Sequence, residues 1–508
     1  MKKTNKLNTS GASHSVQSAK PYILQVNCLL SHFTKIILPA LLIISQFACI
    51  SPKLPMVHQT AHPNAKPFGA PAYSDVCFSS RWVRPRDERD TFDTFVAARQ
   101  FHATSLNWIY TTDADFIKKA ISLGYSVQVA LSPTLPDLPF TNENRLHGRM
   151  LNAAGLPVSA PWMKGWNHWW GCVNHPDFWQ TYLAHIGAGI DAGVFSFQVD
   201  DPAMGFLLLR NKWEDVCYCK HCQRIADSLG LSPPDIQEAS VRAFHKKVKM
   251  RAEELACRPV TFSCNNFEGD WELFPFSEFD FGVAEVPERR ANPEYLYAAI
   301  REARRQGKGQ IFSFANDREW LVQKMIAATY ACGANMLVPW DVWVGGQNRY
   351  FGSPEKFAPL FGFVRAVAPW LDGYEDAAYT TTQDDLRLVD TRPLPVSFNE
   401  YRRQIHAFVR AKPGDMEAPV VIHLVDWHVL MEPFTIQLNE RRFFKKGISS
   451  VELITPVEYD AVLHEKAATS GNFAELAIAK QLDFIKDGDL IKLQIPKLDL
   501  HWGILIVK

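Results

Sequence analysis

The chain has 508 residues, and its 54 basic side chains are balanced by 54 acidic ones. With no net charge and no block of Lys or Arg, it lacks the electrostatic pattern of a nucleic-acid-binding protein. A hydrophobic fraction of 47% with only 21% charged residues excludes a largely disordered chain. The length is sufficient for a large core and more than one domain, and the many aromatic residues suit apolar packing or the faces of sugar rings.

The first 49 residues are predicted to be a leader for export. Scattered lysines precede an apolar run at 36–44, which ends shortly before Ala48-Cys49. This order is typical of a secretory signal, and the run is shorter than the about 20 residues of a membrane span. Ala48-Cys49 resembles the end of a bacterial lipoprotein signal, which would anchor the chain to a membrane through a lipid on Cys49. Whether the exported protein is periplasmic, anchored to the outer membrane or secreted stays open.

Residues 50–74 are proline-rich and predicted to be an extended linker. From residue 75 the sequence alternates short β-type runs with longer helical ones. The predicted strands are Val76–Trp82, Ser105–Thr111, Ser126–Ser132, Val194–Asp200, Val260–Asn265, Phe279–Val286, Gln310–Ala315 and Asn335–Trp343. The predicted helices include Thr91–Phe101, Asp113–Leu123, Asp177–Ala192, Ser240–Ala256, Pro293–Gln306, Glu319–Cys332 and Pro354–Leu371.

This alternation predicts an α/β fold, a (β/α)8 TIM barrel over residues 75–375. An open doubly wound sheet is the weaker alternative, because no G-x-G-x-x-G motif follows the first strand. After residue 375 the sequence contains little helix. Strand-like runs separated by turns predict a C-terminal antiparallel β-sandwich domain over 376–508, with strands at Leu386–Asp390, Gln404–Arg410, Val420–Asp426, Phe434–Leu438, Val451–Ile454, Asp489–Ile495 and Trp502–Val507.

Acidic residues end two of the predicted barrel strands. Active sites of such barrels lie at the carboxyl ends of the strands, where strand four ends in Asp200-Asp201 and strand six reaches Glu285. Glycoside hydrolysis needs one carboxyl group to protonate the leaving oxygen and a second to attack the anomeric carbon or activate water. We therefore expect Asp200 to be the nucleophile or base, with Asp201 as the second candidate, and Glu285 to be the acid/base.

Other polar and aromatic residues at strand ends are predicted to contact a sugar. Strand two contributes Tyr110 and Asn107, and the further candidates are Asn265, Asp317, Trp340, Asp341 and Trp343. The long loop after strand three, residues 133–176, adds Trp162, Trp166, Trp169 and Trp170. These tryptophans are either sugar platforms, with Trp169 and Trp170 as candidates, or a small core beneath the loop.

Cysteines form the most specific local motif. Cys217, Cys219 and Cys222 lie within six residues and can converge on one tetrahedral Zn²⁺, with Cys172 as the expected fourth ligand. Disulfides are the alternative in an exported protein. The C-x-C-x-x-C spacing favours a closed structural zinc site that ties the loops after strands three and four together. No organic cofactor is predicted.

The Cys cluster, with Cys172 lying 45 positions before Cys217, resembles the zinc cluster of glycoside hydrolase family 42 β-galactosidases and of related glycoside-hydrolase-like barrels. In family 42, strand four ends in Asn-Glu with the Glu as acid/base, and strand seven supplies a Glu nucleophile. This chain has Asp200-Asp201 at the end of strand four, with Asp201 at the position of the family's Glu. Its strand seven ends in Phe-Ala-Asn-Asp317, without the Glu nucleophile. An Asp on strand four with an acid on strand six instead resembles α-glycosidase barrels such as α-galactosidases and α-fucosidases. There the strand-four Asp is the nucleophile and the strand-six acid is the acid/base.

The sequence therefore predicts an exported glycoside hydrolase that cleaves an oligo- or polysaccharide. Two alternatives remain: an inactive surface glycan-binding barrel that keeps its Trp platforms, and a polysaccharide lyase, for which the strand ends offer few basic groups. The expected partner is a carbohydrate and not a nucleic acid. An acidic or sulfated glycan stays open because of the arginines near strand ends, Arg81, Arg84, Arg86, Arg289 and Arg290.

Overall fold

The computed structural model describes residues 55–64, 66–79, 93–135, 147–160, 165, 168–204, 216–339, 342–344, 348–350, 353–384, 394–398 and 403–508. The predicted leader lies outside this part of the chain. So do Arg81, Arg84, Arg86, Trp162, Trp166, Trp340, Asp341, the side chain of Trp343 and the predicted strand Leu386–Asp390. Among the described residues, no helix combines the length and the hydropathy that a membrane span requires.

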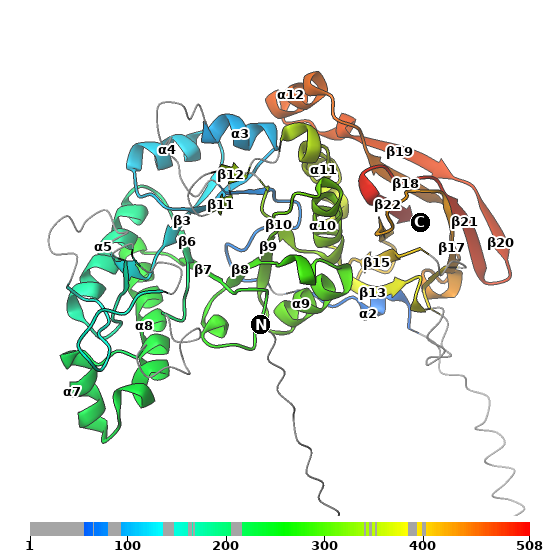
Figure 1. Cartoon of the computed structure of the whole chain (residues 1–508). Coiled ribbons are helices and arrows are strands. Elements are labelled where there is room, and N and C mark those ends of the chain that lie inside the picture. Colours follow the sequence, from blue (N-terminus) through cyan, green and yellow to red (C-terminus); the bar gives the residue numbers. More distant parts are fainter. Residues whose placement is uncertain are drawn as a thin grey trace, which may run out of the picture. The chain divides into compact units, whose positions relative to one another are not determined.

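Eight parallel strands form the first sheet (Figure 1). In order they are β1 (Cys77–Phe78), β2 (Ser105–Ile109), β3 (Ser126–Leu131), β6 (Ser196–Val199), β7 (Thr261–Asn265), β8 (Phe281–Glu285), β9 (Gly309–Ser313) and β10 (Asn335–Met336). A parallel bridge between Cys77 and Leu337 joins the last strand to the first, and the Val338 N–H donates to the Cys77 carbonyl at 2.8 Å. The predicted (β/α)8 barrel is confirmed.

Strand eight departs from the prediction. It was expected to run through Trp343, but β10 stops at Met336. Beyond it, β11 (Val342–Val344) pairs antiparallel with β12 (Asn348–Tyr350), outside the barrel sheet. Leu337 and Val338 still bond to Cys77 of β1, whereas Val342–Val344 pairs with a different strand. A continuous run of β-forming residues does not reveal where the chain changes its partner strand.

The barrel helices follow their predicted places, and several of them begin at a side-chain cap. These helices are α3 (Thr94–Gln100), α4 (Ala114–Ser122), α5 (Pro176–Asp191), α8 (Pro233–Ala256), α9 (Pro293–Arg305), α10 (Glu319–Cys332) and α11 (Pro354–Ala366). Asp93, Asp113 and Asn292 accept backbone N–H groups of the first turn. Helix α8 starts two turns earlier than predicted because Ser232 and Asp235 form a capping box with Pro233 at the first helical position.

Two sheets make up the C-terminal domain, and the predicted antiparallel sandwich is confirmed. One has the order β13 (Glu375–Thr381), β15 (Ile405–Ala411), β16 (Val420–Asp426), β22 (Trp502–Val507), β18 (Val451–Pro456) and β19 (Ala477–Leu482). The other is β14 (Val396–Phe398), β17 (Phe434–Asn439), β21 (Leu490–Ile495) and β20 (Phe484–Asp487). Apolar side chains of both sheets form one core between them. Strands β13, β14, β19 and β20 and helix α12 (Ala461–Ser470) were not predicted.

Barrel and C-terminal strands share a hydrophobic core. Helix α10 is buried along nearly its whole length, and Phe408, Val421 and Trp502 of the C-terminal domain belong to the same apolar cluster as the barrel helices. Figure 1 shows α10 and α11 lying beside the C-terminal strands. The Lys324 ammonium donates to the carbonyls of Trp427 and His428, both at 2.8 Å.

The described part of the predicted linker is packed rather than extended. A short helix, α2 (Val57–Thr60), lies against β13, and Val57 is fully buried. The Thr60 hydroxyl donates to the Ala377 carbonyl at 2.9 Å.

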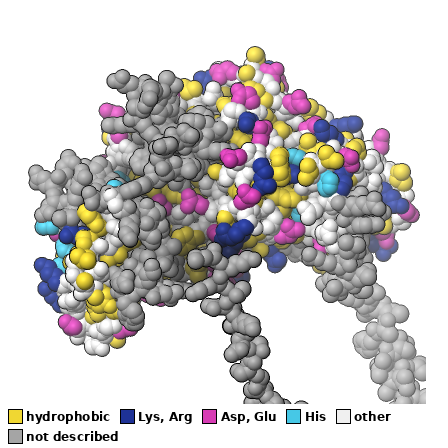
Figure 2. All heavy atoms as spheres, in the orientation of Figure 1, with side chains coloured by type: hydrophobic (Ala, Val, Ile, Leu, Met, Phe, Trp, Pro, Cys, Tyr) yellow, Lys and Arg dark blue, Asp and Glu magenta, His cyan; other side chains and the backbone are white. Residues whose placement is uncertain are grey.

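The molecular face drawn in Figure 2 has acidic and basic side chains interspersed over it, as the balanced charge of the chain leads one to expect.

Candidate active site

The carboxyl ends of four barrel strands bring Asp200, Glu285, Asn265 and Tyr110 together. The Asn265 amide nitrogen lies 3.1 Å from Asp200 Oδ1 and 3.3 Å from Glu285 Oε2, so a single NH₂ group bridges the two carboxylates. The Tyr110 hydroxyl donates to the other oxygen of Asp200. Asp200 is half-buried, whereas Glu285 is exposed. All four of these residues, which the sequence analysis placed at strand ends, therefore meet at the mouth of the barrel.

A β-bulge in β2 directs Tyr110 toward Asp200. The pairing with β3 shifts register between Leu106 and Ile109, and Trp108 has φ of 57°. Such a left-handed conformation is rare for a bulky residue, and the extra residue reverses the inward and outward alternation of the strand. As a result Asn107 and Tyr110 both face the barrel interior, although strict alternation would place them on opposite faces.

Polar side chains form the layer beneath the carboxylates. The Gln128 amide nitrogen lies 3.1 Å from both the Ser196 and the Ser263 hydroxyl oxygens, and the Ser263 hydroxyl donates to Gln198. The Asn107 amide donates to Gln128 at 3.4 Å. Asn107 is therefore buried in this layer, below the mouth. This network joins β2, β3, β6 and β7. It therefore fixes the positions of these strands relative to one another, and with them the side chains at their carboxyl ends.

Asp201 starts a turn instead of extending strand four. Its φ is 44°, its N–H donates to Asp200 Oδ1 at 3.1 Å, and its carbonyl accepts the Met204 N–H at 3.0 Å. Left-handed non-glycine residues recur here: Trp108, Asp201, Met204 and Phe267 all lie at or just beyond the ends of β2, β6 and β7. Backbone strain of this kind concentrates at functional sites.

Residues in the loops after the fifth, sixth and seventh barrel strands form ion pairs at the rim. Asp317 is exposed in the loop after β9, and its neighbours Asn316 and Arg318 both bind Glu288; the Asn316 amide does so at 2.7 Å. Arg289 and Arg290 both pair with Glu268, the latter at 2.7 Å. These two arginines, predicted as contacts for an acidic or sulfated glycan, thus share one carboxylate of the protein, which balances one of their two positive charges.

The two described tryptophans of the long loop differ in exposure. Trp170 is fully buried in a small cluster with Met150, Ala226 and the cysteines, which is the small core named as the alternative to a sugar platform. We therefore no longer treat Trp170 as a substrate contact. Trp169 is half-buried, and the Arg149 guanidinium lies 5.6 Å from its ring centroid.

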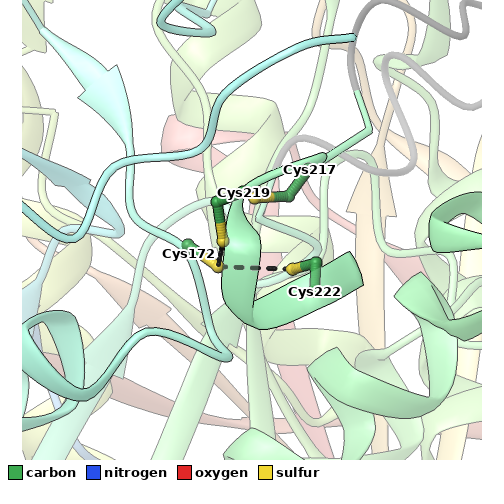
Figure 3. A group of neighbouring side chains, drawn as sticks. All are labelled: Cys172, Cys217, Cys219 and Cys222. Atoms are coloured by element: carbon green, nitrogen blue, oxygen red, sulfur yellow. Dashed lines mark hydrogen bonds between the residues drawn. The ribbon is translucent and has the colours of Figure 1, made fainter. Parts of the chain in front are cut away.

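Four buried cysteines converge in this loop core (Figure 3). The sulfur atoms of Cys172, Cys217, Cys219 and Cys222 all lie within 4.8 Å of one another. Cys172 Sγ is 3.6 Å from that of Cys219 and 3.5 Å from that of Cys222. All described cysteines are free thiols, so no disulfide joins these four. The four thiols are within metal-binding distance, and they join the loop after β5 (Trp169–Trp170) to the start of α7 (Lys220–Leu229).

Solved structures of other proteins have a fold similar to that of this chain. No family model matches the chain, and no curated protein matches it. A cycloisomaltooligosaccharide glucanotransferase from Paenibacillus sp., solved with cycloisomaltoheptaose, is similar with a TM-score of 0.55 and 10% identity, over 86% of this chain and 85% of that one.

Two further solved structures are similar. An α-amylase from H. orenii has a TM-score of 0.47 and 9% identity over 85% of this chain and 99% of its own. A debranching enzyme from Nostoc punctiforme, soaked with acarbose, has a TM-score of 0.47 and 10% identity over 86% and 98%. At these identities the likeness concerns the fold alone. The resemblance to family 42 rests on the cysteine spacing.

Trp108, Gln128 and the contact between Tyr110 and Asp200 were missed from the sequence. Gln128 lies in an apolar run whose polar members carry no distinguishing spacing. Trp108 falls on the outer face in a regular strand, and only the bulge turns it inward, where it packs with Ala130 and Val283. A bulge depends on the pairing of two strands, and one strand's sequence does not reveal it.

Proposed function

We propose that the chain is an exported glycoside hydrolase in which Asp200 and Glu285 are the two catalytic carboxyl groups. The observation that carries the proposal is the amide of Asn265, which bridges these carboxylates at the mouth of a glycosidase-like barrel. Asp200 follows β6 and Glu285 ends β8, so the Asn265 amide reaches both from β7, which lies between them. Glycoside hydrolysis needs such a pair of carboxyl groups.

The hydrogen bonds favour Asp200 as the nucleophile. Its carboxylate accepts the Tyr110 hydroxyl, the Asn265 amide and the Asp201 N–H. Donors of this kind stabilise the ionised form of a carboxyl group, and a nucleophile must be ionised. Glu285 is exposed toward the mouth and is the group that would deliver a proton to the leaving oxygen.

The same amide supports retention of anomeric configuration. Because one nitrogen lies 3.1 Å from Asp200 Oδ1 and 3.3 Å from Glu285 Oε2, these two oxygens are at most about 6.4 Å apart. Retaining enzymes have carboxyl groups about 5–5.5 Å apart, and inverting enzymes need about 6.5–9.5 Å to admit a water. We expect the first product detected by NMR to have the anomeric configuration of the substrate; initial release of the opposite anomer would contradict retention.

The cysteine cluster is proposed to hold a structural Zn²⁺. A Zn–S distance of about 2.3 Å places tetrahedral thiolates about 3.8 Å apart, and the sulfur of Cys172 lies 3.5 and 3.6 Å from two of its neighbours. Four protein ligands leave no open position, so the metal would fold the loop and take no part in catalysis. The resemblance to family 42 supports the same assignment. Export, with a lipid on Cys49 as one route to a membrane, rests on the leader sequence.

Hydrolysis tests the function directly. Wild type and Asp200→Asn are incubated with a panel of α- and β-linked glycans that includes glucans, galactans and sulfated polysaccharides, and released sugars are quantified. We expect release by wild type and its loss in the variant. Retained binding to one glycan without any release would favour the glycan-binding alternative, and a new absorbance from an unsaturated product would favour a lyase.

A further inference from the structure

We propose that Tyr110 is a positioning residue for Asp200, and that Trp108 orients it by a hydrogen bond; this inference rests on the proposed function. The Trp108 indole N–H donates to the Tyr110 oxygen at 3.1 Å, and the Tyr110 hydroxyl donates to Asp200. A phenol oxygen that already accepts one hydrogen bond turns its own hydrogen toward the remaining acceptor. Trp108 therefore selects the rotamer in which the hydroxyl faces the carboxylate.

The backbone is strained to make this contact. Trp108 is buried at 1% exposure with φ of 57°, in the register shift of β2. Side chains along a barrel strand normally alternate between the interior and the exterior. The extra residue of the bulge shifts this alternation, so the side chains of both Trp108 and Tyr110 face the interior. A conformation this unfavourable for a bulky residue persists only where the surrounding packing enforces it. Here the strained backbone at Trp108 places the Tyr110 hydroxyl so that it donates to Asp200.

The charge around Asp200 defines the effect of that donor. The Asp200 carboxylate accepts hydrogen bonds from the Tyr110 hydroxyl, the Asn265 amide and the Asp201 N–H, and the Glu285 carboxylate lies across the same amide. The negative charge of Glu285 raises the energy of an ionised Asp200. The hydroxyl of Tyr110 opposes that repulsion, so its loss moves the pKa of Asp200 upward.

Covalent labelling measures this effect without a known natural substrate. Cyclitol epoxides of gluco, galacto and fuco configuration esterify a carboxylate nucleophile: its oxygen attacks a ring carbon, the epoxide C–O bond breaks, and the new alkoxide takes a proton from the acid. The labelling rate of Asp200 is followed by mass spectrometry from pH 4 to pH 8. For Tyr110→Phe we expect the acidic midpoint to rise by about one pH unit.

Trp108→Phe keeps the hydroxyl but removes the indole N–H, and its midpoint should move in the same direction by less. Tyr125→Phe is the matched control, since Tyr125 lies just before β3 at the opposite end of the strands and should leave the midpoint unchanged. Thermal unfolding confirms that each variant is folded.

The outcomes separate the two claims. Labelling of wild type with an unchanged midpoint in folded Tyr110→Phe and Trp108→Phe would overturn the positioning role and leave the hydrolase intact. No label at Asp200 together with no hydrolysis on the glycan panel would overturn the proposed function, and this inference with it.

Discussion

At the scale of single residues, the two carboxyl groups are expected to differ in what they do for a leaving group. Glu285→Gln removes the proton donor, which matters little when the leaving group is an activated phenol. We expect this variant to retain much of its kcat/KM for a dinitrophenyl glycoside, which reports the first chemical step, while its kcat/KM for a glycan falls by at least about 100-fold. Asp200→Asn should lose both. Steady-state kinetics on both substrates would measure the difference, and equal losses in Glu285→Gln would argue against its acid role.

Gly333 shows how a residue remote from the site constrains the fold. It caps α10 with φ of 82°, and a Cβ there would collide with guanidinium nitrogens of Arg304 and Arg410. Arg410 is 1% exposed and donates to the Tyr374 carbonyl, so it has no room to retreat. Gly333→Ala should lower the free energy of unfolding by more than the about 1–2 kcal/mol of a left-handed alanine.

Gly124→Ala is the control for this prediction, because its φ is 89° and nothing lies within 4 Å of the added Cβ. It should lose only the backbone contribution. Denaturant unfolding would compare the two variants, and equal losses would show that the guanidinium contact costs nothing.

At the scale of elements, the cysteine core should depend on its metal. Cys219→Ser removes one of four ligands in a buried cluster, and a structural site of this kind contributes directly to folding. We expect one zinc per chain in wild type, its loss in the variant, and a lower midpoint of thermal unfolding. Elemental analysis and calorimetry measure both quantities.

Cys257→Ser serves as the control, because Cys257 is exposed and outside the cluster. Zinc should stay at one per chain in that variant. A metal-free wild type whose unfolding does not respond to added zinc would contradict the assignment.

Elements differed in how well their sequence determined them. Helix α10 matches its predicted bounds, since its apolar run ends at a glycine C-cap. Strand β19 escaped prediction because most of its side chains are exposed at a sheet edge, so no burial pattern marks it. The bulge in β2 and the early end of β10 escaped for another reason: both are set by the partner strand, which local sequence does not contain.

At the scale of the whole molecule, buried histidines are expected to make stability fall in acid. Burial lowers the pKa of His102 and His406 to about 3 and that of His185 and His245 to about 4. The unfolded chain, with histidine pKa values near 6.5, therefore binds more protons than the folded one between about pH 6.5 and pH 4, so the free energy of unfolding falls as pH falls.

The expected loss is about 2 kcal/mol for each such histidine by pH 5. Thermal unfolding measured from pH 7.5 to pH 4.5 would show it, and His406→Phe should flatten the dependence because it removes one of these groups from a buried position. A midpoint that stays constant over this range would contradict the prediction.

The sequence by itself determined the architecture and which candidate residues lie at the carboxyl ends of the strands. Eight alternations of strand and helix predicted the barrel, and Asp200, Asn265 and Glu285 were found at strand ends because the active-site edge of a barrel is a property of its topology. The cysteine spacing likewise predicted which four thiols meet. Only the tertiary structure decided that Trp170 is core, that Arg289 and Arg290 share the carboxylate of Glu268, and that Tyr110 reaches Asp200. The reason is physical: strand periodicity and motif spacing are local along the chain, whereas burial, ion pairing and strand register depend on residues that are distant in sequence.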